Sequence, residues 1–351
     1  MPALTPQFMM DLESRMQLLT ENEYARLVQG LWWQNLAKVK TTTAGKEILA
    51  WLLSTAKIYP EGKGGNIRFD DLVSTYTTME PKFSGAGLKL NKAQFEDTDG
   101  QGMNLAAEWS SQIGAQIAYW PQEQVADFLM HAHEAGTYVG YDGKPFFAVD
   151  HPVNPYRTGV TFANLLTGTA GVGGNSGTTS PGALPIDASV PVDTALLNLQ
   201  RLFAYIASIK MPNGKQPRRL RPRFILTPPS LTFRAVQLTQ AKFIAQLASG
   251  GGAASADVEA LIQALGYAAP VQADELGGFE DEKTYFVACE QVTSSQLGAI
   301  TFLEREPYKI LYYGSQTEAE LDRRDEYEWH VKGRNGMGAG HPFLLFKVKG
   351  V

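Results

Sequence analysis

The stretch "YDGKPFFAVDHPVNP", residues 141–155, places an aspartate directly before a histidine at the end of an aromatic run, with turn residues on both sides. Two interpretations compete for Asp150 and His151. Histidine changes its charge near neutral pH more easily than other side chains, so the pair can be an acid/base couple of an active site. Alternatively, Pro152 pushes His151 into an extended conformation, and the stretch is a strand that leads into a turn.

The rest of the chain favours the second interpretation. It contains no nucleophile elbow, no lysine base motif and no third ligand set that would complete an active site. In "HAHEAG", His131 and His133 are two residues apart, so on a helix they project about 200° from each other and do not share a metal. We therefore predict a structural role for the corner and expect no catalytic residue, no metal site and no cofactor.

The glycine-rich motif "GRNGMGAGHP", residues 333–342, could suggest a phosphate-binding loop, but its surroundings do not fit one. A phosphate-binding loop needs a following helix to aim its amides, whereas Pro342 and the strand-like run "FLLFKVKG" follow here. We predict that these glycines allow a tight crossing between strands. His341, in the turn before Pro342, is expected to be solvated.

Length and composition limit the class of protein. A chain of 351 residues with 44% hydrophobic and 19% charged residues can bury one large core or two smaller ones, so two domains are expected. The longest apolar run, residues 48–56, is far shorter than the roughly 20 residues that span a bilayer. The single cysteine, Cys289, lies in a strand-like run and is predicted to be a buried, inert thiol. A net charge of −5 argues against a protein whose main work is neutralising phosphates.

The spacing of apolar residues in the first part of the chain predicts two long helical segments with a two-stranded segment between them. Residues 6–38 have helical spacing and form an amphipathic arm. Residues 57–90 are rich in Gly, Thr and aromatic residues. They predict a long two-stranded hairpin, which must lie on another surface to be stable. Residues 102–136 predict a long helical rod with a kink or restart near Trp120, before Pro121, and an end at Gly136.

The second half alternates helices and strands and then changes to strands. A helix at 192–209, a strand at 223–229 and a helix from 230 to about 247 predict a mixed α/β domain over about 150–285, followed by C-terminal strands. The run "KQPRRLRPR", residues 215–223, is strongly basic. It fits an anion or nucleic-acid contact, a subunit-interface patch or a solvated loop.

Four motifs, taken in their order, resemble one known family. They are "YDGKPFFAVDHP" after a long helix, the downstream "NLLTG", the run "MPNGKQPRRLRPRFILTPPSL" and the terminal "VKGRNGMGAG". Together they resemble the major head subunit family of Mu-like phages and prophages, and the resemblance covers most of the chain.

The resemblance implies an α+β Hong Kong 97-type capsid fold, with an N-terminal arm, an extended E-loop, a peripheral domain and an axial domain. The arm would be residues 1–54 and the E-loop 55–88. The peripheral domain would be 89–149 and 291–351, with the spine helix at 102–136, and the axial domain would be 150–290. In this reading Asp150, His151 and Pro152 form the junction where the spine helix gives way to the axial domain.

The function implied by the resemblance is that of a major capsid protein of a tailed double-stranded DNA phage, which assembles through hexamers and pentamers into an icosahedral shell and is not an enzyme. Expected partners are further copies of the chain, with scaffold, portal and decoration proteins as additional candidates, weak contact with packaged DNA and no membrane. The expected location is the virion capsid, assembled in the bacterial cytoplasm. The candidate subunit-interface residues are Met9, Leu12, Met16, Leu19, Tyr59, Lys63, Arg68, Arg218, Arg219 and Arg221.

Two alternatives remain open from the sequence. An encapsulating nanocompartment shares the same fold and would be distinguished by a peptide that docks inside the shell. A hydrolase using Asp150 and His151 would require a pocket with a third polar residue.

Overall fold

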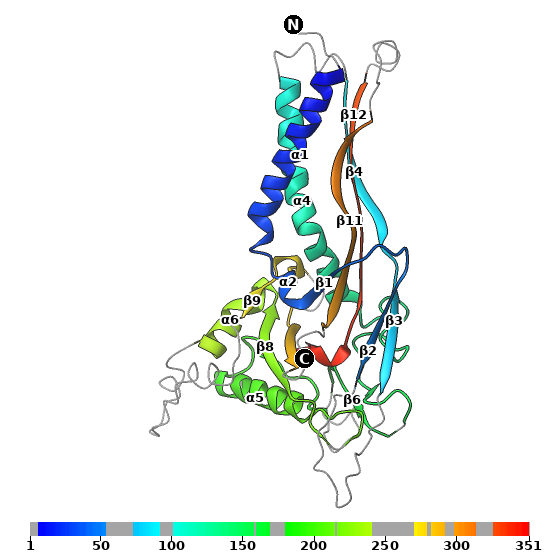
Figure 1. The fold of residues 1–351 in the computed structure, drawn as a ribbon. Coiled ribbons are helices and arrows are strands. Elements are labelled where there is room, and N and C mark those ends of the chain that lie inside the picture. The colour runs from blue at the N-terminus through cyan, green and yellow to red at the C-terminus, as the bar shows by residue number, and fades with distance from the viewer. Residues whose placement is uncertain are drawn as a thin grey trace, which may run out of the picture.

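The computed structural model describes residues 6–53, 73–91, 101–157, 159–168, 180–214, 216–240, 270–278, 282–291, 298–313 and 326–350. These residues form an elongated upper layer of two long helices beside long strands, which stands on a broader base of shorter strands and helices (Figure 1). The hydrophobic cluster of the upper layer is separate from the large cluster that fills the base.

The two long helices of the upper layer are α1 (Pro6–Val28) and α4 (Gln101–His131), which pack against each other. Their contact is close because a glycine lies at the crossing: a Cβ atom on Gly114 would stand 2.6 Å from the carbonyl oxygen of Thr20. The Thr20 hydroxyl donates a hydrogen bond to the Ser110 carbonyl at 3.0 Å, also across the helix pair. The short helix α2 (Trp33–Leu36) follows α1.

A four-stranded sheet covers these helices in the order β1, β11, β12 and β4. The bounds are β1 Ala37–Thr41, β4 Lys82–Asn91, β11 Ile300–Tyr312 and β12 Glu326–Ala339. Along β12, Tyr327, Trp329 and Val331 are buried with residues of α1 and α4, while the residues between them lie on the outer face. This is the alternation expected of a half-buried strand, and it was predicted from the sequence.

A separate two-stranded hairpin joins β2 (Glu47–Leu52) and β3 (Ser74–Met79) in antiparallel register. Its Leu49 and Met79 pack on Leu303 of β11. The glycine motif makes this approach feasible, because a Cβ on Gly338 would overlap the Met79 side chain at 2.3 Å. The predicted tight crossing at residues 333–342 is confirmed.

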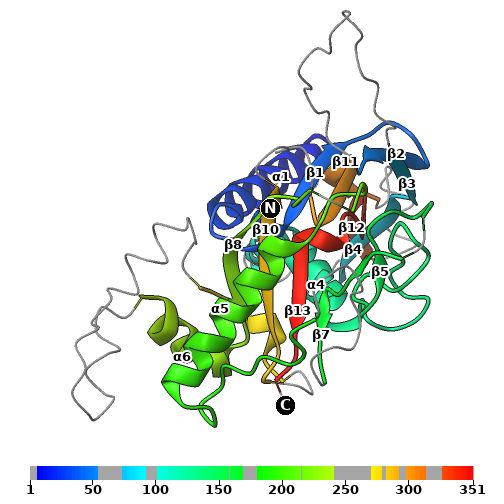
Figure 2. The same ribbon diagram turned by 90° about the horizontal axis from the view of Figure 1, so that it is seen from below.

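The base is built on a five-stranded sheet in the order β7, β13, β10, β8 and β9. Its strands are β7 Leu165–Leu166, β8 Leu220–Thr227, β9 Val271–Gln272, β10 Tyr285–Gln291 and β13 Leu345–Val348. The helices α5 (Val192–Ser208) and α6 (Pro229–Gln240) pack beside β8, and α5 crosses this part of the molecule in the view from below (Figure 2). The short elements around it are β5 His151–Pro152, β6 Thr161–Phe162, η1 Asp274–Leu276 and η2 Pro342–Leu344.

The predicted domain limits need correction at two places. The predicted E-loop of residues 55–88 includes β4, which is instead a strand of the four-stranded sheet, while the hairpin already begins at β2; residues 54–72 lie outside the described residues. The predicted peripheral segment 291–351 includes β13, which pairs with β10 and β7 in the other sheet. Hydrogen-bond partners far away in the sequence decide both assignments.

The predicted helix 102–136 forms without the expected restart. α4 runs through Pro121 and ends at His131, five residues before Gly136, which adopts φ = 85°. Proline lowers helix stability, but packing along the helix can offset this cost. Beside Pro121, Gln122 is buried and accepts a hydrogen bond from the backbone amide of Trp32 at 3.2 Å.

The predicted N-terminal arm is part of the subunit's own fold over most of its length. Leu12 and Met16 of α1 are buried, Met16 at 1% exposure, against residues of α4 and β12. Their proposed role at a subunit interface is therefore wrong, because the partner that covers the apolar stripe is the chain's own spine helix and sheet. Strand β1, also within the predicted arm, pairs with β11.

Candidate functional site

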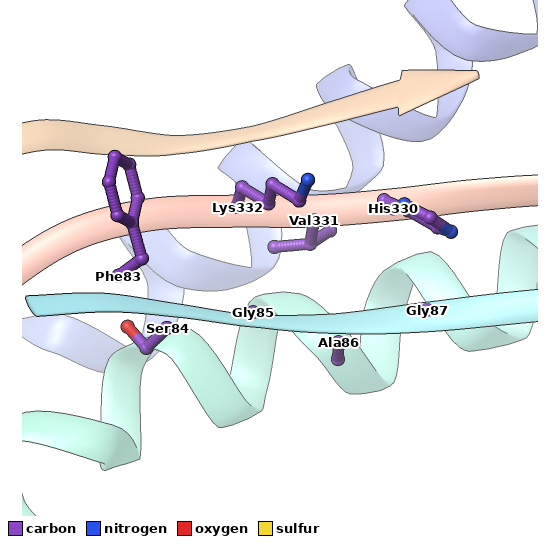
Figure 3. A pocket seen from close by; sticks show the side chains of 8 residues that line it. All are labelled: Phe83, Ser84, Gly85, Ala86, Gly87, His330, Val331 and Lys332. Carbon is purple, nitrogen blue, oxygen red and sulfur yellow. The ribbon is translucent and has the colours of Figure 1, made fainter. Parts of the chain in front are cut away.

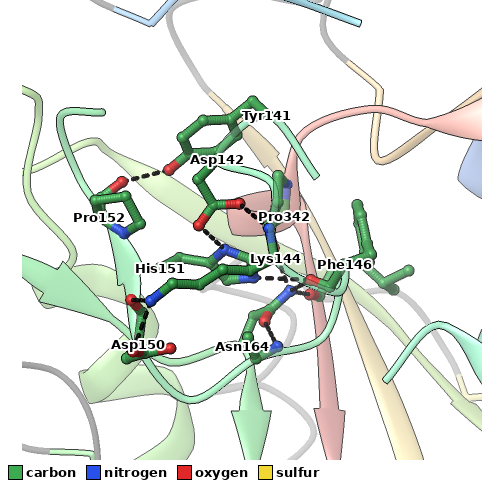
Figure 4. A network of polar contacts seen from close by, with 11 residues as sticks. Tyr141, Asp142, Lys144, Phe146, Asp150, His151, Pro152, Asn164 and Pro342 are labelled. Atoms are coloured by element: carbon green, nitrogen blue, oxygen red, sulfur yellow. Dashed lines mark hydrogen bonds and ion pairs between the residues drawn. The ribbon is translucent and has the colours of Figure 1, made fainter. Parts of the chain in front are cut away.

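The corner at Asp150, His151 and Pro152 is a structural junction built around the buried His151 (Figure 4). The His151 side chain is fully buried, with Nδ1 2.8 Å from the Asp142 carboxylate and Nε2 2.9 Å from the Phe146 carbonyl oxygen. Asp150 is exposed and pairs with Lys144 at 2.6 Å. Asp150 and His151 therefore do not form an acid/base couple, and His151 instead fixes the loop that follows the spine helix.

Asp142, which sequence reasoning missed, is the charged partner of this junction. Burial acts to raise the pKa of its carboxyl group, but the hydrogen bond and charge of His151 outweigh burial, so the pKa of Asp142 lies below its ordinary value. The ion pair is thus an internal connection between the 141–146 loop and β5.

Asn164, the first residue of the "NLLTG" motif, ties the junction to the C-terminal strand. Its Oδ1 accepts a hydrogen bond from the Ala148 amide at 2.9 Å. Its Nδ2 lies within hydrogen-bonding distance of the carbonyl oxygens of Phe146 (2.8 Å), Pro342 (3.1 Å) and Leu345 (3.3 Å). One fully buried amide therefore joins three segments that are far apart in the sequence.

Lys347 of β13 connects the base to the end of the spine helix. Its side chain is fully buried, and Nζ donates hydrogen bonds to the carbonyl oxygens of Leu129 (3.0 Å) and Met130 (2.9 Å) in the last turn of α4. A cation at this position complements the negative end of the helix dipole. Burial and the Lys347 charge lower the pKa of the neighbouring His133.

We expect Lys347→Met to lower the free energy of unfolding by about 2–4 kcal/mol, because the carbonyl groups at the end of α4 would remain buried without their donor. Urea unfolding followed by circular dichroism measures this change. Lys349→Met is the matched control, because Lys349 is only half-buried and the same charge is removed. Equal stability of both variants would show that Lys347 does not anchor the helix.

A second buried polar cluster lies at the root of the hairpin, where Arg218 was predicted to face a neighbouring subunit. Its side chain is buried: Nη1 donates to the Leu53 carbonyl oxygen at 3.2 Å, and the guanidinium lies 3.9 Å from the centre of the Phe343 ring. Burial lowers the pKa of Arg218 to about 10. Its assignment to a subunit interface is wrong, because the side chain turns into its own subunit.

His341, predicted to be solvated, is also buried in this cluster, at 1% exposure. Its ring packs against Trp51 and Phe343 with centroid distances of 4.9 Å each, and neither ring nitrogen has a hydrogen-bond partner. Burial and the charge of Arg218 lower the pKa of His341 to about 3. The sequence pattern of a histidine before a proline gave no indication of this burial.

The remaining predicted interface residues divide into two groups. Leu19, Arg219 and Arg221 are exposed, and Arg219 adopts φ = 59°. The side chain of Met9 lies outside the described residues, as do Tyr59, Lys63 and Arg68. The basic run is therefore not one patch, since Arg218 points inward and Arg223 pairs with Glu290 at 3.2 Å.

The outer face of the hairpin is an apolar surface that the sequence analysis did not single out. Ile48, Leu52 and Tyr76 are 64%, 53% and 67% exposed. The strand register pairs Ala50 with Tyr76, so the three side chains share the face opposite to Leu49 and Met79. A signal was present in the sequence, because both alternating sets of positions in "EILAWL" contain apolar residues.

Among the described residues, no group of three or more His, Cys, Asp or Glu side chains could hold a metal ion. No helix in the described part is both long and apolar enough to cross a membrane. Cys289, predicted to be buried, is half-buried as a residue, and burial of its thiol raises the thiol pKa well above its ordinary value.

Comparison with known proteins finds one family model that matches part of the chain. Residues 21–174 match the family model described as Mu-like prophage major head subunit gpT. Over this segment, a little under half of its length, the chain is similar to a phage major head subunit. The match includes the hairpin, the spine helix and the junction around His151.

The chain also resembles solved phage capsids in its fold. The capsid of cyanophage P-SCSP1u aligns with a TM-score of 0.50 and 14% identity, over 90% of this chain and 86% of that chain. The procapsid of bacteriophage JBD30 aligns with a TM-score of 0.48 and 13% identity, over 99% and 76% of the two chains. A virus-like particle from Pyrococcus furiosus aligns with a TM-score of 0.47 and 8% identity, over 96% and 98%. No curated protein matches, and the fold is of the Hong Kong 97 capsid type.

Proposed function

We propose that the subunits join into hexamers and pentamers through the outer face of the β2–β3 hairpin, and that the resulting icosahedral shell encloses a double-stranded DNA genome. The observation that carries this proposal is the exposure of Ile48, Leu52 and Tyr76 together on one face of a two-stranded sheet. Contiguous exposed apolar surface on a subunit marks a site of protein–protein contact.

The hairpin is suited to this role because its two faces are used differently. Leu49 and Met79 hold one face against the four-stranded sheet of the same subunit. The other face is free to contact a neighbour, and a two-stranded hairpin gains stability from such coverage. A contact between the hairpin of one copy and a different surface of the next copy is heterologous. Copies joined by repeating such a contact form a closed ring when the rotation from one copy to the next divides a full turn.

Further features of the proposal follow from charge and exposure. Leu19 on α1, and Arg219 and Arg221 beside β8, remain candidates for additional contacts between copies. The net charge of −5 supports weak, non-specific contact with packaged DNA. Assembly in the bacterial cytoplasm, with scaffold, portal and decoration proteins as partners, belongs to the same proposal.

The proposal includes the absence of catalysis at the junction. His151 is enclosed by Asp142 and Phe146, and Asp150 pairs with Lys144 at the surface. This geometry gives no support to the hydrolase alternative. The nanocompartment alternative shares the fold, and a cargo peptide docked inside purified shells would favour it.

We expect the triple variant Ile48→Thr, Leu52→Thr and Tyr76→Thr to fold but not to form shells, because threonine retains strand propensity while removing the apolar contact. Negative-stain electron microscopy and size-exclusion chromatography of the purified protein measure assembly. Val39→Thr is the matched control: Val39 is exposed to a similar extent, 52%, but lies on β1. Shells at the wild-type yield from the triple variant would contradict the proposal.

A further inference from the structure

A hollow of about 530 Å³ lies on the outer face of the four-stranded sheet, between β4 and β12 (Figure 3). It is lined by Phe83, Ser84, Gly85, Ala86 and Gly87 of β4 and by His330, Val331 and Lys332 of β12. None of the lining residues is acidic. The hollow is separate from the hairpin face and from the buried junction.

Two glycines create the hollow. In the strand register, Gly85 lies opposite Lys332 and Gly87 lies opposite His330, so the long side chains of β12 face positions on β4 that carry none. Gly85 cannot be replaced without strain, because a Cβ would stand 2.2 Å from the Val331 carbonyl oxygen. At Gly87 the nearest atom to a Cβ would be Cδ2 of the His330 side chain at 3.3 Å, which can move aside.

The strand beside the hollow has an open edge. β4 is the end strand of its sheet and pairs with β12 alone among the described strands. Gly85, Ala86 and Gly87 are exposed, and no proline occurs in Lys82–Asn91 to block a further strand. Alternate backbone amides and carbonyls of an edge strand point outward and can pair with another extended chain.

The surroundings of this edge are cationic and aromatic. Lys332 forms no ion pair with any described carboxylate, and its Nζ lies 5.0 Å from the centre of the Tyr313 ring. The Arg334 guanidinium lies 4.7 Å from the centre of the exposed Phe83 ring. The nearby Glu326 and Glu328 share one cation, Lys89, at 2.5 and 3.3 Å, so these three groups together carry one negative charge. Lys332 and Arg334 thus leave a local excess of positive charge on this face.

We propose that the open edge of β4 binds an extended, acidic polypeptide segment of a partner protein, which adds to the sheet as a further strand. Its backbone would pair with β4 between Phe83 and Leu88. Its acidic side chains would reach across Gly85 and Gly87 to Lys332, which is feasible because these positions carry no side chain. Arg334 lies opposite Phe83 and adds positive charge beside this path. The unpaired strand edge favours a polypeptide over a nucleic acid, which cannot continue the ladder of backbone hydrogen bonds.

The experiment is fluorescence anisotropy with the full-length protein and a labelled ten-residue peptide that alternates glutamate with threonine or valine. The expected result is saturable binding that Lys332→Glu and Gly87→Val each weaken at least tenfold. The first variant reverses the charge that the peptide meets, and the second fills the hollow. Arg15→Glu, which makes the same charge change on the exposed surface of α1, is expected to alter binding less than twofold.

Three further results separate the alternatives. The same peptide with alternate amides methylated is expected not to bind, and equal binding by it would overturn strand addition. Equal or tighter binding of a single-stranded oligothymidylate of the same length would reassign the surface to nucleic acid. Absence of peptide binding to the wild type would also overturn the proposal. Lys332→Glu keeps the test decisive if Gly87→Val unfolds, since Lys332 is exposed and its replacement leaves the core unchanged.

Discussion

Replacing Asn164 with alanine is expected to lower the free energy of unfolding by about 4 kcal/mol. The change removes the acceptor of the Ala148 amide and one donor to each of the carbonyl groups of Phe146, Pro342 and Leu345 at once. Of these carbonyl groups, that of Phe146 keeps His151 Nε2 as a partner and that of Pro342 keeps the Leu345 amide. A buried polar group that loses its partner costs about 1–3 kcal/mol, and water reaches this fully buried position poorly. Equilibrium unfolding in urea, followed by tryptophan fluorescence, measures the loss.

Asn198→Ala provides the matched control for this prediction. Asn198 is also a buried asparagine, but its Nδ2 donates one hydrogen bond, to the Pro185 carbonyl oxygen at 2.8 Å. We expect this variant to lose about 1 kcal/mol. If both asparagine variants lose the same amount, Asn164 does not hold the three segments together, and the junction must depend on packing instead.

The second large effect is expected in the acid stability of the subunit. His341 has a pKa of about 3 in the folded protein, against an ordinary value of 6.5. The unfolded chain therefore binds a proton more readily, and the stability that neutral His341 contributes is fully present above pH 6.5 and is lost as the pH falls toward 3. The slope is about 1.4 kcal/mol per pH unit, which gives roughly 4–5 kcal/mol over the whole range.

His341→Phe should remove this part of the pH dependence, because phenylalanine keeps the ring between Trp51 and Phe343 but does not titrate. The measurement is the urea midpoint at a series of pH values between 7 and 4, compared between variant and wild type. The difference between the two curves is the relevant quantity, because it cancels the contribution of the groups that the two proteins share. His330→Gln, at a half-buried position on the outer face, serves as the control. Parallel curves for wild type and His341→Phe would disprove the prediction.

The sequence predicted those elements whose pattern is local. The helical spacing of residues 102–136 and 192–209 led to α4 and α5, and the alternation of Tyr327, Trp329 and Val331 led to β12. The glycines of 333–342 predicted a close approach, which occurs against β3. The corner at His151 could be separated from an active site because the chain lacks a third catalytic partner in any recognisable motif.

The sequence could not predict which surface covers an amphipathic stripe. The apolar spacing of Leu12 and Met16 fits a contact with a neighbouring subunit as well as a contact with the subunit's own core. Periodicity identifies an apolar face of a helix but not the surface that covers it. The same holds for Arg218, which lies in a basic run and yet turns inward.

By itself, the sequence determined the long helices, the strand-rich C-terminal part and a structural corner at Asp150-His151-Pro152, since each depends on the spacing of neighbouring residues. Only the tertiary structure decided that Asp142 pairs with His151, that Asn164 and Lys347 join distant segments, and that His341 is buried. These contacts span up to 218 positions in the chain. They arise because buried polar groups must find partners wherever packing places them, and that placement is a property of the whole fold.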